Sequence, residues 1–95
     1  MNLERDVKAK IKEVLNKVGA WWYMPPGGAY GRIGVPDFII CMNGKFAAVE
    51  AKFGPNKPTV RQVQEMEAVI KTGGQALVVN EKTNWESFEL FLRGL

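Results

Sequence analysis

Hydrophobic residues recur in the first part of the chain with the spacing of an amphipathic helix. Over residues 3–18, apolar side chains follow one another at intervals of one, three or four positions, and lysines lie between them. The apolar set is Leu3, Val7, Ile11, Val14, Leu15 and Val18. This spacing gathers them on one helix face, which predicts a helix packed against a core. We expect Asn2 to cap its start and Gly19 to end it.

Shorter apolar runs separated by turn residues make up the rest of the chain. Strands are predicted at Trp21–Met24, Val35–Met42, Lys45–Phe53 and Gln75–Asn80, and helices at Thr59–Thr72 and from Thr83, where a capping box to Glu86 is expected. The order is α-β-β-β-α-β-α. A crossover through the second helix makes the last strand parallel to its neighbour. The predicted fold class is therefore α/β, with a mixed sheet flanked by helices.

Composition narrows the class of protein. The chain has 95 residues, of which 46% are hydrophobic, and we expect one domain over residues 1–95. No apolar run approaches the roughly 20 residues of a membrane span, so no membrane partner is expected. With one cysteine, Cys41, no internal disulfide can form, which predicts an intracellular, cytoplasmic protein. We expect Cys41 to be a small core residue.

The absence of histidine excludes whole classes of chemistry. Ser-His-Asp and Cys-His nucleophiles, histidine acid–base catalysis and histidine metal sites are all impossible. What remains is carboxylate and lysine chemistry, together with a metal ion that prefers oxygen ligands. The net charge of +3 is a weak indication of a polyanionic partner.

The Asn43-Gly44 pair predicts which residues meet across the hairpin. Asn-Gly between two apolar runs is typical of a two-residue turn. Counting outward from that turn places Asp37 directly opposite Glu50, with side-chain origins roughly 5 Å apart on one sheet face. Lys52 lies two residues beyond Glu50 and points to the same face. Facing like charges destabilise a sheet, which suggests that this pair binds a divalent cation.

Mg²⁺ or Mn²⁺ suits these oxygen ligands best. Asp37, Glu50 and the carbonyl of Ala51 are the candidate metal ligands, and Lys52 could stabilise a hydroxide or the charge on a phosphate. The alternative is structural, namely a cross-strand ion pair of Lys52 with a carboxylate on a solvated face.

These motifs resemble a nuclease superfamily. Gly34 with Pro36-Asp37, then Val49-Glu50-Ala51-Lys52, is similar to the PD-(D/E)xK nucleases, and more narrowly to stand-alone, virus-type VRR-NUC domains. Glu4, Thr59 with Gln62, and Gly73-Gly74 extend the resemblance over residues 3–80. The family implies a restriction-endonuclease-like core and Mg²⁺- or Mn²⁺-dependent cleavage of DNA, often at four-way junctions or flaps and often by a homodimer. It is compatible with a virus-encoded protein acting in the host cytoplasm.

Two further candidate catalytic residues have two interpretations each. Gln62 could be the capping-box partner of Thr59 or a polar side chain that orients water or phosphate. The resemblance favours the second role. Glu4 could be a favourable acid near a helix start, whereas the family would make it an acidic site residue.

Basic and aromatic residues suggest how nucleic acid could bind. The candidates are Tyr30, Arg32, Lys57 and Arg61. Of Trp21 and Trp22, alternation should turn one inward. The remaining charges are interpreted as solvated helix faces: Lys8, Lys10, Lys12, Lys17, Glu13, Glu65 and Glu67.

We therefore expect a metal-dependent endonuclease that acts on DNA, and dimerisation is suggested by its small size and by aromatic residues near 21–30 and 85–91. One alternative is a non-catalytic nucleic-acid-binding module of the same fold. A calcium-binding structural protein fits less well, because Ca²⁺ prefers six to eight oxygens and the sequence offers too few.

Overall fold

The predicted element order is confirmed by a computed structural model, which describes residues 1–27 and 31–95. The helices are α1 (Glu4–Val18), α2 (Val60–Lys71) and α3 (Trp85–Arg93), and the strands are β1 (Trp21–Tyr23), β2 (Phe38–Met42), β3 (Lys45–Ala51) and β4 (Gln75–Val79). None of the helices in the described ranges is long and apolar enough to cross a membrane.

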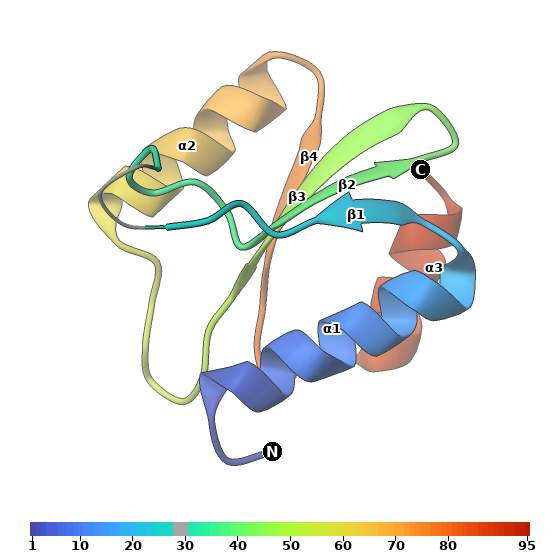
Figure 1. Ribbon diagram of the computed structural model, residues 1–95, viewed down its shortest axis with the longest axis horizontal. Helices are drawn as coiled ribbons and strands as arrows, with labels where there is room; N and C mark the ends of the chain where they lie inside the picture. The colour runs from blue at the N-terminus through green and yellow to red at the C-terminus, as the bar shows by residue number, and fades with distance from the viewer. Residues whose placement is uncertain (28–30) are drawn as a thin grey trace.

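The four strands form one mixed sheet in the order β1-β2-β3-β4 (Figure 1). The β1–β2 and β2–β3 pairs are antiparallel, and β4 joins β3 in parallel through the α2 crossover. The predicted mixed sheet is therefore correct.

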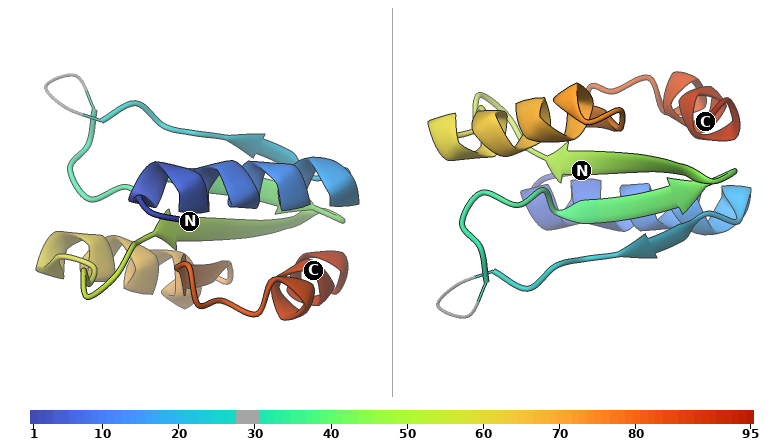
Figure 2. Two further views of the ribbon diagram at one scale, coloured as in Figure 1. Left: turned by 90° about the horizontal axis from the view of Figure 1, so that it is seen from below. Right: turned by 90° about the horizontal axis from the view of Figure 1, so that it is seen from above.

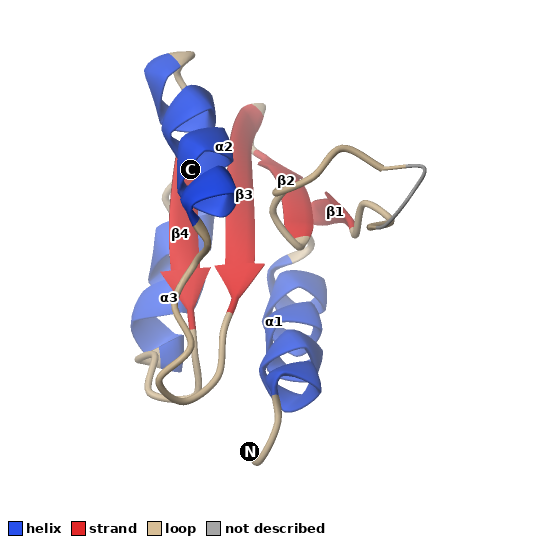
Figure 3. Ribbon diagram, turned by 90° about the vertical axis from the view of Figure 1, so that its left-hand side faces the viewer, coloured by secondary structure: helices blue, strands red, loops and turns tan. Residues whose placement is uncertain are grey.

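Helices cover the two faces of the sheet unequally. The core lies between the sheet and α1 with α3, where Ile11, Leu15, Phe38, Ile40 and Leu92 are fully buried. Helix α2 lies on the opposite face, in front of β3 and β4 (Figure 3). The view along the sheet in Figure 2 shows β1 at one edge. This restriction-endonuclease-like layout agrees with the expected fold class.

The hairpin has the predicted turn and register. Asn43 and Gly44 adopt φ of 55° and 77°, as a two-residue turn of this type requires. Met42 pairs with Lys45 and Phe38 with Val49. The strands are shorter than predicted. For β2 the reason is Pro36, which has no N–H to donate to a neighbouring strand, and β2 begins only at Phe38.

Two predicted helix caps are wrong by one residue. Leu3 rather than Asn2 is the N-cap of α1, because the Asp6 carboxylate accepts hydrogen bonds from the backbone N–H groups of both. Asn84 rather than Thr83 caps α3 and accepts from the Ser87 N–H. The Thr83 hydroxyl instead accepts from the Asn80 N–H, closing the preceding turn.

The sheet face beside α2 is apolar and exposed. Cys41 is exposed rather than buried in the core, because it points to this face between Trp21 and Phe46, which are 61% and 45% exposed. The alternation expected for the two tryptophans is confirmed. Trp22 packs on Phe38 with ring centroids 5.8 Å apart, and its indole N–H donates to Asn16.

Candidate active site

The ends of β2 and β3 bring Asp37 and Glu50 together. Phe38 and Val49 form the last backbone pair of the hairpin, so the next residues outward are Asp37 and Glu50. Beyond the ladder, a side chain continues the pairing: the Ala51 N–H donates to Oδ2 of Asp37 at 2.8 Å. This bond holds the Asp37 carboxylate at the end of the hairpin, beside Glu50. The predicted juxtaposition of the two acids is therefore present in the structure.

Glu50 is an acid buried at the floor of the site. Its side chain is 2% exposed, and its Oε1 accepts a hydrogen bond from Nε2 of Gln62 at 3.1 Å. Nζ of Lys52 lies 3.9 Å from the same oxygen. The other oxygen, Oε2, is buried and has no hydrogen-bond partner within the described residues. A buried carboxylate oxygen without a partner is costly, and such a group needs a proton or a cation.

The electrostatic state of Glu50 follows from this environment. The pKa of Glu50 is raised to about 8, mainly by burial, and the neighbouring Asp37 adds to the rise. Lys52 acts in the opposite direction, and Glu4 contributes a weaker upward effect. Without a cation, this environment therefore favours the protonated form of Glu50 near neutral pH.

Gln62 forms the predicted capping box and also contacts Glu50. Its side-chain Oε1 accepts a hydrogen bond from the backbone N–H of Thr59 at 2.9 Å, and its backbone N–H donates to the Thr59 hydroxyl. Together these two bonds form a complete capping box. Its Nε2 reaches Glu50 at the same time. The cap of α2 therefore orients the amide toward the buried acid.

Lys8 belongs to the site, although its position was interpreted as part of a solvated face. Its Nζ lies 3.6 Å from Oδ1 of Asp37 and 3.6 Å from Oε2 of Glu4. Glu4, with a side chain 38% exposed, therefore stands at the rim and reaches Asp37 through this lysine. Because Glu4 was expected to face the site, its i+4 neighbour on the helix was the available signal for Lys8.

A cleft of about 630 Å³ opens beside Asp37. Its lining includes Lys8, Asp37 and Gln62, together with Arg32 from the loop before β2. Tyr30, another candidate for nucleic-acid binding, lies outside the described residues. Lys57 is exposed in the turn after β3 and forms no ion pair with a site residue in the described parts of the chain.

Glu65 is buried, so its interpretation as a solvated charge is wrong. Its Oε1 accepts from Arg32 at 2.9 Å and lies 3.2 Å from Nη2 of Arg61. These two arginines were predicted to bind nucleic acid, and the structure places them together near the cleft. Glu13 and Glu67 are exposed, as expected.

The donor set fits a small divalent cation. In the ranges that the structure describes, no group of three or more His, Cys, Asp or Glu side chains is arranged so that it could hold a metal ion. Mg²⁺ needs fewer, since it commonly binds one or two carboxylates and keeps several waters. The backbone carbonyl and N–H of a strand residue point to the same edge, so the Ala51 carbonyl shares the direction of the N–H that reaches Asp37. Asp37, Glu50 and this carbonyl could hold such an ion.

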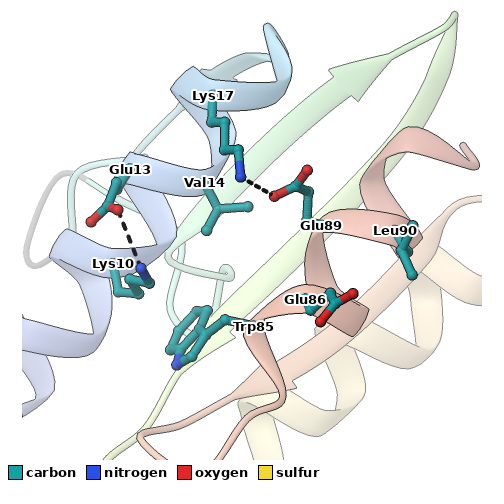
Figure 4. Close-up of a pocket in the computed structure, with 8 residues that line it drawn as sticks. All are labelled: Lys10, Glu13, Val14, Lys17, Trp85, Glu86, Glu89 and Leu90. Atoms are coloured by element: carbon teal, nitrogen blue, oxygen red, sulfur yellow. Dashed lines mark hydrogen bonds and ion pairs between the residues drawn. The ribbon is translucent and has the colours of Figure 1, made fainter.

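A second groove lies between α1 and α3, away from these residues (Figure 4). Its charged side chains are largely paired with one another, Lys17 with Glu89 at 2.8 Å and Lys10 with Glu13 at 3.2 Å. None of the predicted site residues lines it.

One relative bears on the identity of the chain. The sequence is 30% identical over 82 residues to the protein named "Putative nuclease p44" of Acyrthosiphon pisum secondary endosymbiont phage 1. The match spans 83% of this chain and 84% of the phage protein. The chain belongs to the family of this phage protein. No model of a known protein family matches the sequence.

Proposed function

We propose that this chain is a divalent-metal-dependent endonuclease that hydrolyses DNA phosphodiester bonds. The observation that carries the proposal is the buried Glu50 beside Asp37. Its Oε2 has no hydrogen-bond partner among the described residues, and Lys52 and Gln62 lie on its other oxygen. The name of the phage relative supports nuclease activity in general. The PD…ExK arrangement and the T-x-x-Q helix support the narrower assignment to VRR-NUC-type domains.

The protein groups have separable roles in this proposal. Asp37, Glu50 and the Ala51 carbonyl would hold Mg²⁺ or Mn²⁺, which when bound lowers the pKa of a coordinated water and polarises the phosphate. The Ala51 N–H fixes one oxygen of Asp37, and the amide of Gln62 fixes one oxygen of Glu50. Lys52 stands where it can stabilise negative charge that develops on the phosphate. Glu4 would orient the Lys8 ammonium at the rim.

The preferred substrate is proposed to be branched DNA, such as a four-way junction or a flap, cut by a homodimer. A chain of 95 residues offers little surface for gripping a junction from both sides. The exposed apolar face of the sheet, with Trp21 and Tyr23 on the edge strand, supports pairing of two copies. The aromatic residues of α3 support it less, because Phe88 is buried in the core and Trp85 and Phe91 pack against it.

Cleavage assays with Mg²⁺ or Mn²⁺ on junction, flap and linear duplex test the proposal. Asp37→Asn should lower the rate by several orders of magnitude, since the cation and the oriented donors supply most of the charge stabilisation. Lys52→Ala should also lower it strongly. Lys45→Ala, at the exposed far end of the same strand, is the matched control and should cut like the parent.

A folded Lys52→Ala variant that cleaves as fast as the parent would contradict the proposed roles. If DNA binds but no divalent cation supports hydrolysis, the chain is a nucleic-acid-binding module of the same fold. Equal rates on linear and branched DNA would remove only the substrate preference.

A further inference from the structure

Glu65 is the second buried acid of the described residues, and the proposed catalytic chemistry does not use it. Glu50 and Glu65 are the charged side chains buried there, at 2% and 9% exposed. Glu65 lies on α2, one turn beyond Gln62, and one of its oxygens meets two guanidinium groups, from Arg32 and Arg61. Burying a carboxylate is costly unless it is paired, and one arginine would satisfy that need. The presence of two suggests that the acid also serves to place one of them.

Arg61 is the fixed member of the pair. Its Nε donates to the Ile33 carbonyl at 3.3 Å, and its Nη1 donates to Gln64 at 3.4 Å. The loop also presses against its backbone: a Cβ added to Gly34 would lie 2.9 Å from the Arg61 carbonyl carbon. Arg61 and Glu65 therefore form a fixed ion pair on α2, and the loop before β2 packs against it.

Arg32 is the member that faces solvent and the cleft. Its side chain is 67% exposed, and it lines the cleft together with Lys8, Asp37 and Gln62. A guanidinium has five N–H donors on three nitrogens, and Glu65 engages Arg32 through Nη2 alone among the described contacts. A guanidinium held by a carboxylate on one side keeps donors in a planar fork for a phosphate on the other.

We propose that Glu65 is a positioning residue that holds the Arg32 guanidinium at the wall of the cleft, where it binds a backbone phosphate of DNA next to the phosphate at Asp37. This inference rests on the proposed function, because it takes the ligand of the cleft to be DNA. It assigns the loop before β2 a defined binding role and gives α2 a second task besides presenting Gln62.

The direction of the change in DNA affinity distinguishes this positioning role from a simple charge effect. Glu65→Gln removes one negative charge, and so does Glu67→Gln on the exposed side of the same helix. Charge counting alone predicts tighter DNA binding by both variants. Positioning predicts weaker binding by Glu65→Gln, by about threefold or more, because Arg32 loses its ion-pair partner and phosphate contacts are the main source of non-specific affinity. Glu67→Gln should bind as tightly as the parent or slightly more tightly.

The measurement is the equilibrium binding of a fluorescently labelled short duplex without divalent cations, so that no cleavage occurs, over a series of salt concentrations. Arg32→Gln should reduce the slope of log Kobs against log salt by about 0.9, the value for one lost phosphate contact. In the Arg32→Gln background, adding Glu65→Gln should cause no further loss of affinity. Arg32→Lys keeps the charge without the planar fork, and should bind more weakly than the parent.

The proposal would be overturned if Glu65→Gln bound DNA as tightly as Glu67→Gln. It would also be overturned if Glu65→Gln still lowered the DNA affinity in the Arg32→Gln background. If Glu65→Gln fails to fold by thermal melting, the Arg32 variants decide: full binding and an unchanged salt slope in Arg32→Gln and Arg32→Lys overturn the proposal. Absence of duplex binding by the parent also overturns it. A protein that shows these binding effects but cleaves nothing retains this inference and loses the nuclease proposal, so the two failures are distinguishable.

Discussion

Lys8 is the residue whose position most changes the expected chemistry of the site. Its ammonium lies 3.6 Å from Oδ1 of Asp37, the oxygen that the Ala51 N–H leaves available. A cation bound at Asp37 must share that carboxylate with this charge. A phosphate entering the cleft would be attracted by it. In the proposed function, the same side chain would therefore oppose metal binding and favour substrate binding.

Lys8→Met should consequently have two opposite effects. Mn²⁺ should bind several-fold more tightly, because a positive charge within about 4 Å of a ligand is removed. Duplex DNA should bind more weakly, with a lower salt slope. Calorimetric titration of Mn²⁺ and a DNA-binding series measure the two effects. Lys12→Met removes an exposed lysine from the same helix. It should leave the Mn²⁺ affinity unchanged, and any change in DNA affinity should have the same sign as that of Lys8→Met.

The titration of Glu50 predicts how stability depends on pH. In the metal-free protein its pKa is raised from 4.5 to about 8, first by burial and then by Asp37. Between these pH values the folded state holds a proton that the unfolded state releases, so the free energy of unfolding falls as pH rises. Thermal melts in EDTA should show this fall from pH 5 to pH 8.5, and Glu50→Gln should flatten it. Glu67→Gln is the control with an unchanged pH profile, and an equally steep fall in Glu50→Gln would refute the assignment.

At the scale of elements, the contact between α2 and the loop before β2 decides whether the cleft keeps its shape. Gly34 has φ of +83°, and a Cβ there would lie 2.6 Å from Cγ of Arg61. Gly34→Ala should therefore lower the free energy of unfolding by about 1–3 kcal/mol, from backbone strain and overlap. Gly27→Ala is the control, because a Cβ at Gly27 meets nothing within 4 Å. Equal melting temperatures for both variants would contradict the tight contact.

The sequence was most informative where one element dictates its own geometry. Asn43-Gly44 fixed a register that reached Asp37 and Glu50, and Thr59 with Gln62 predicted both a cap and a site residue. It was least informative where packing between distant elements decides. Cys41 is exposed because α2 covers only part of one sheet face, and Glu65 is buried because a loop 33 residues away folds onto it. The periodicity of a single helix or strand cannot predict the exposure of Cys41 or the burial of Glu65.

At the scale of the whole molecule, the half-covered sheet face is the surface that a second copy would use. Trp21 and Tyr23 lie on the edge strand at 61% and 51% exposed, and Phe46 extends the same face. An open edge strand beside an apolar face is a liability for a protein that stays monomeric.

Light scattering coupled to gel filtration should therefore give a dimer mass for the parent and a monomer mass for Trp21→Lys. The control is Leu90→Lys on α3, an apolar residue that is 64% exposed, which should leave the dimer intact. A monomeric parent at working concentration would exclude the homodimer, and dissociation by Leu90→Lys instead would move the interface to α3.

The hydrogen bond that follows the last backbone pair of the hairpin is accepted by the Asp37 side chain, so exchange of the Ala51 amide proton reports on the position of Asp37. The Ala51 amide proton is protected by the Asp37 carboxylate, whereas the next amide, Lys52, is held by the Val79 carbonyl in the sheet. Whenever Asp37 swings away, the first proton becomes open to deuterium while the second stays shielded. The ratio of their exchange rates thus counts how often the acid leaves its place, with no substrate, no metal and no turnover required.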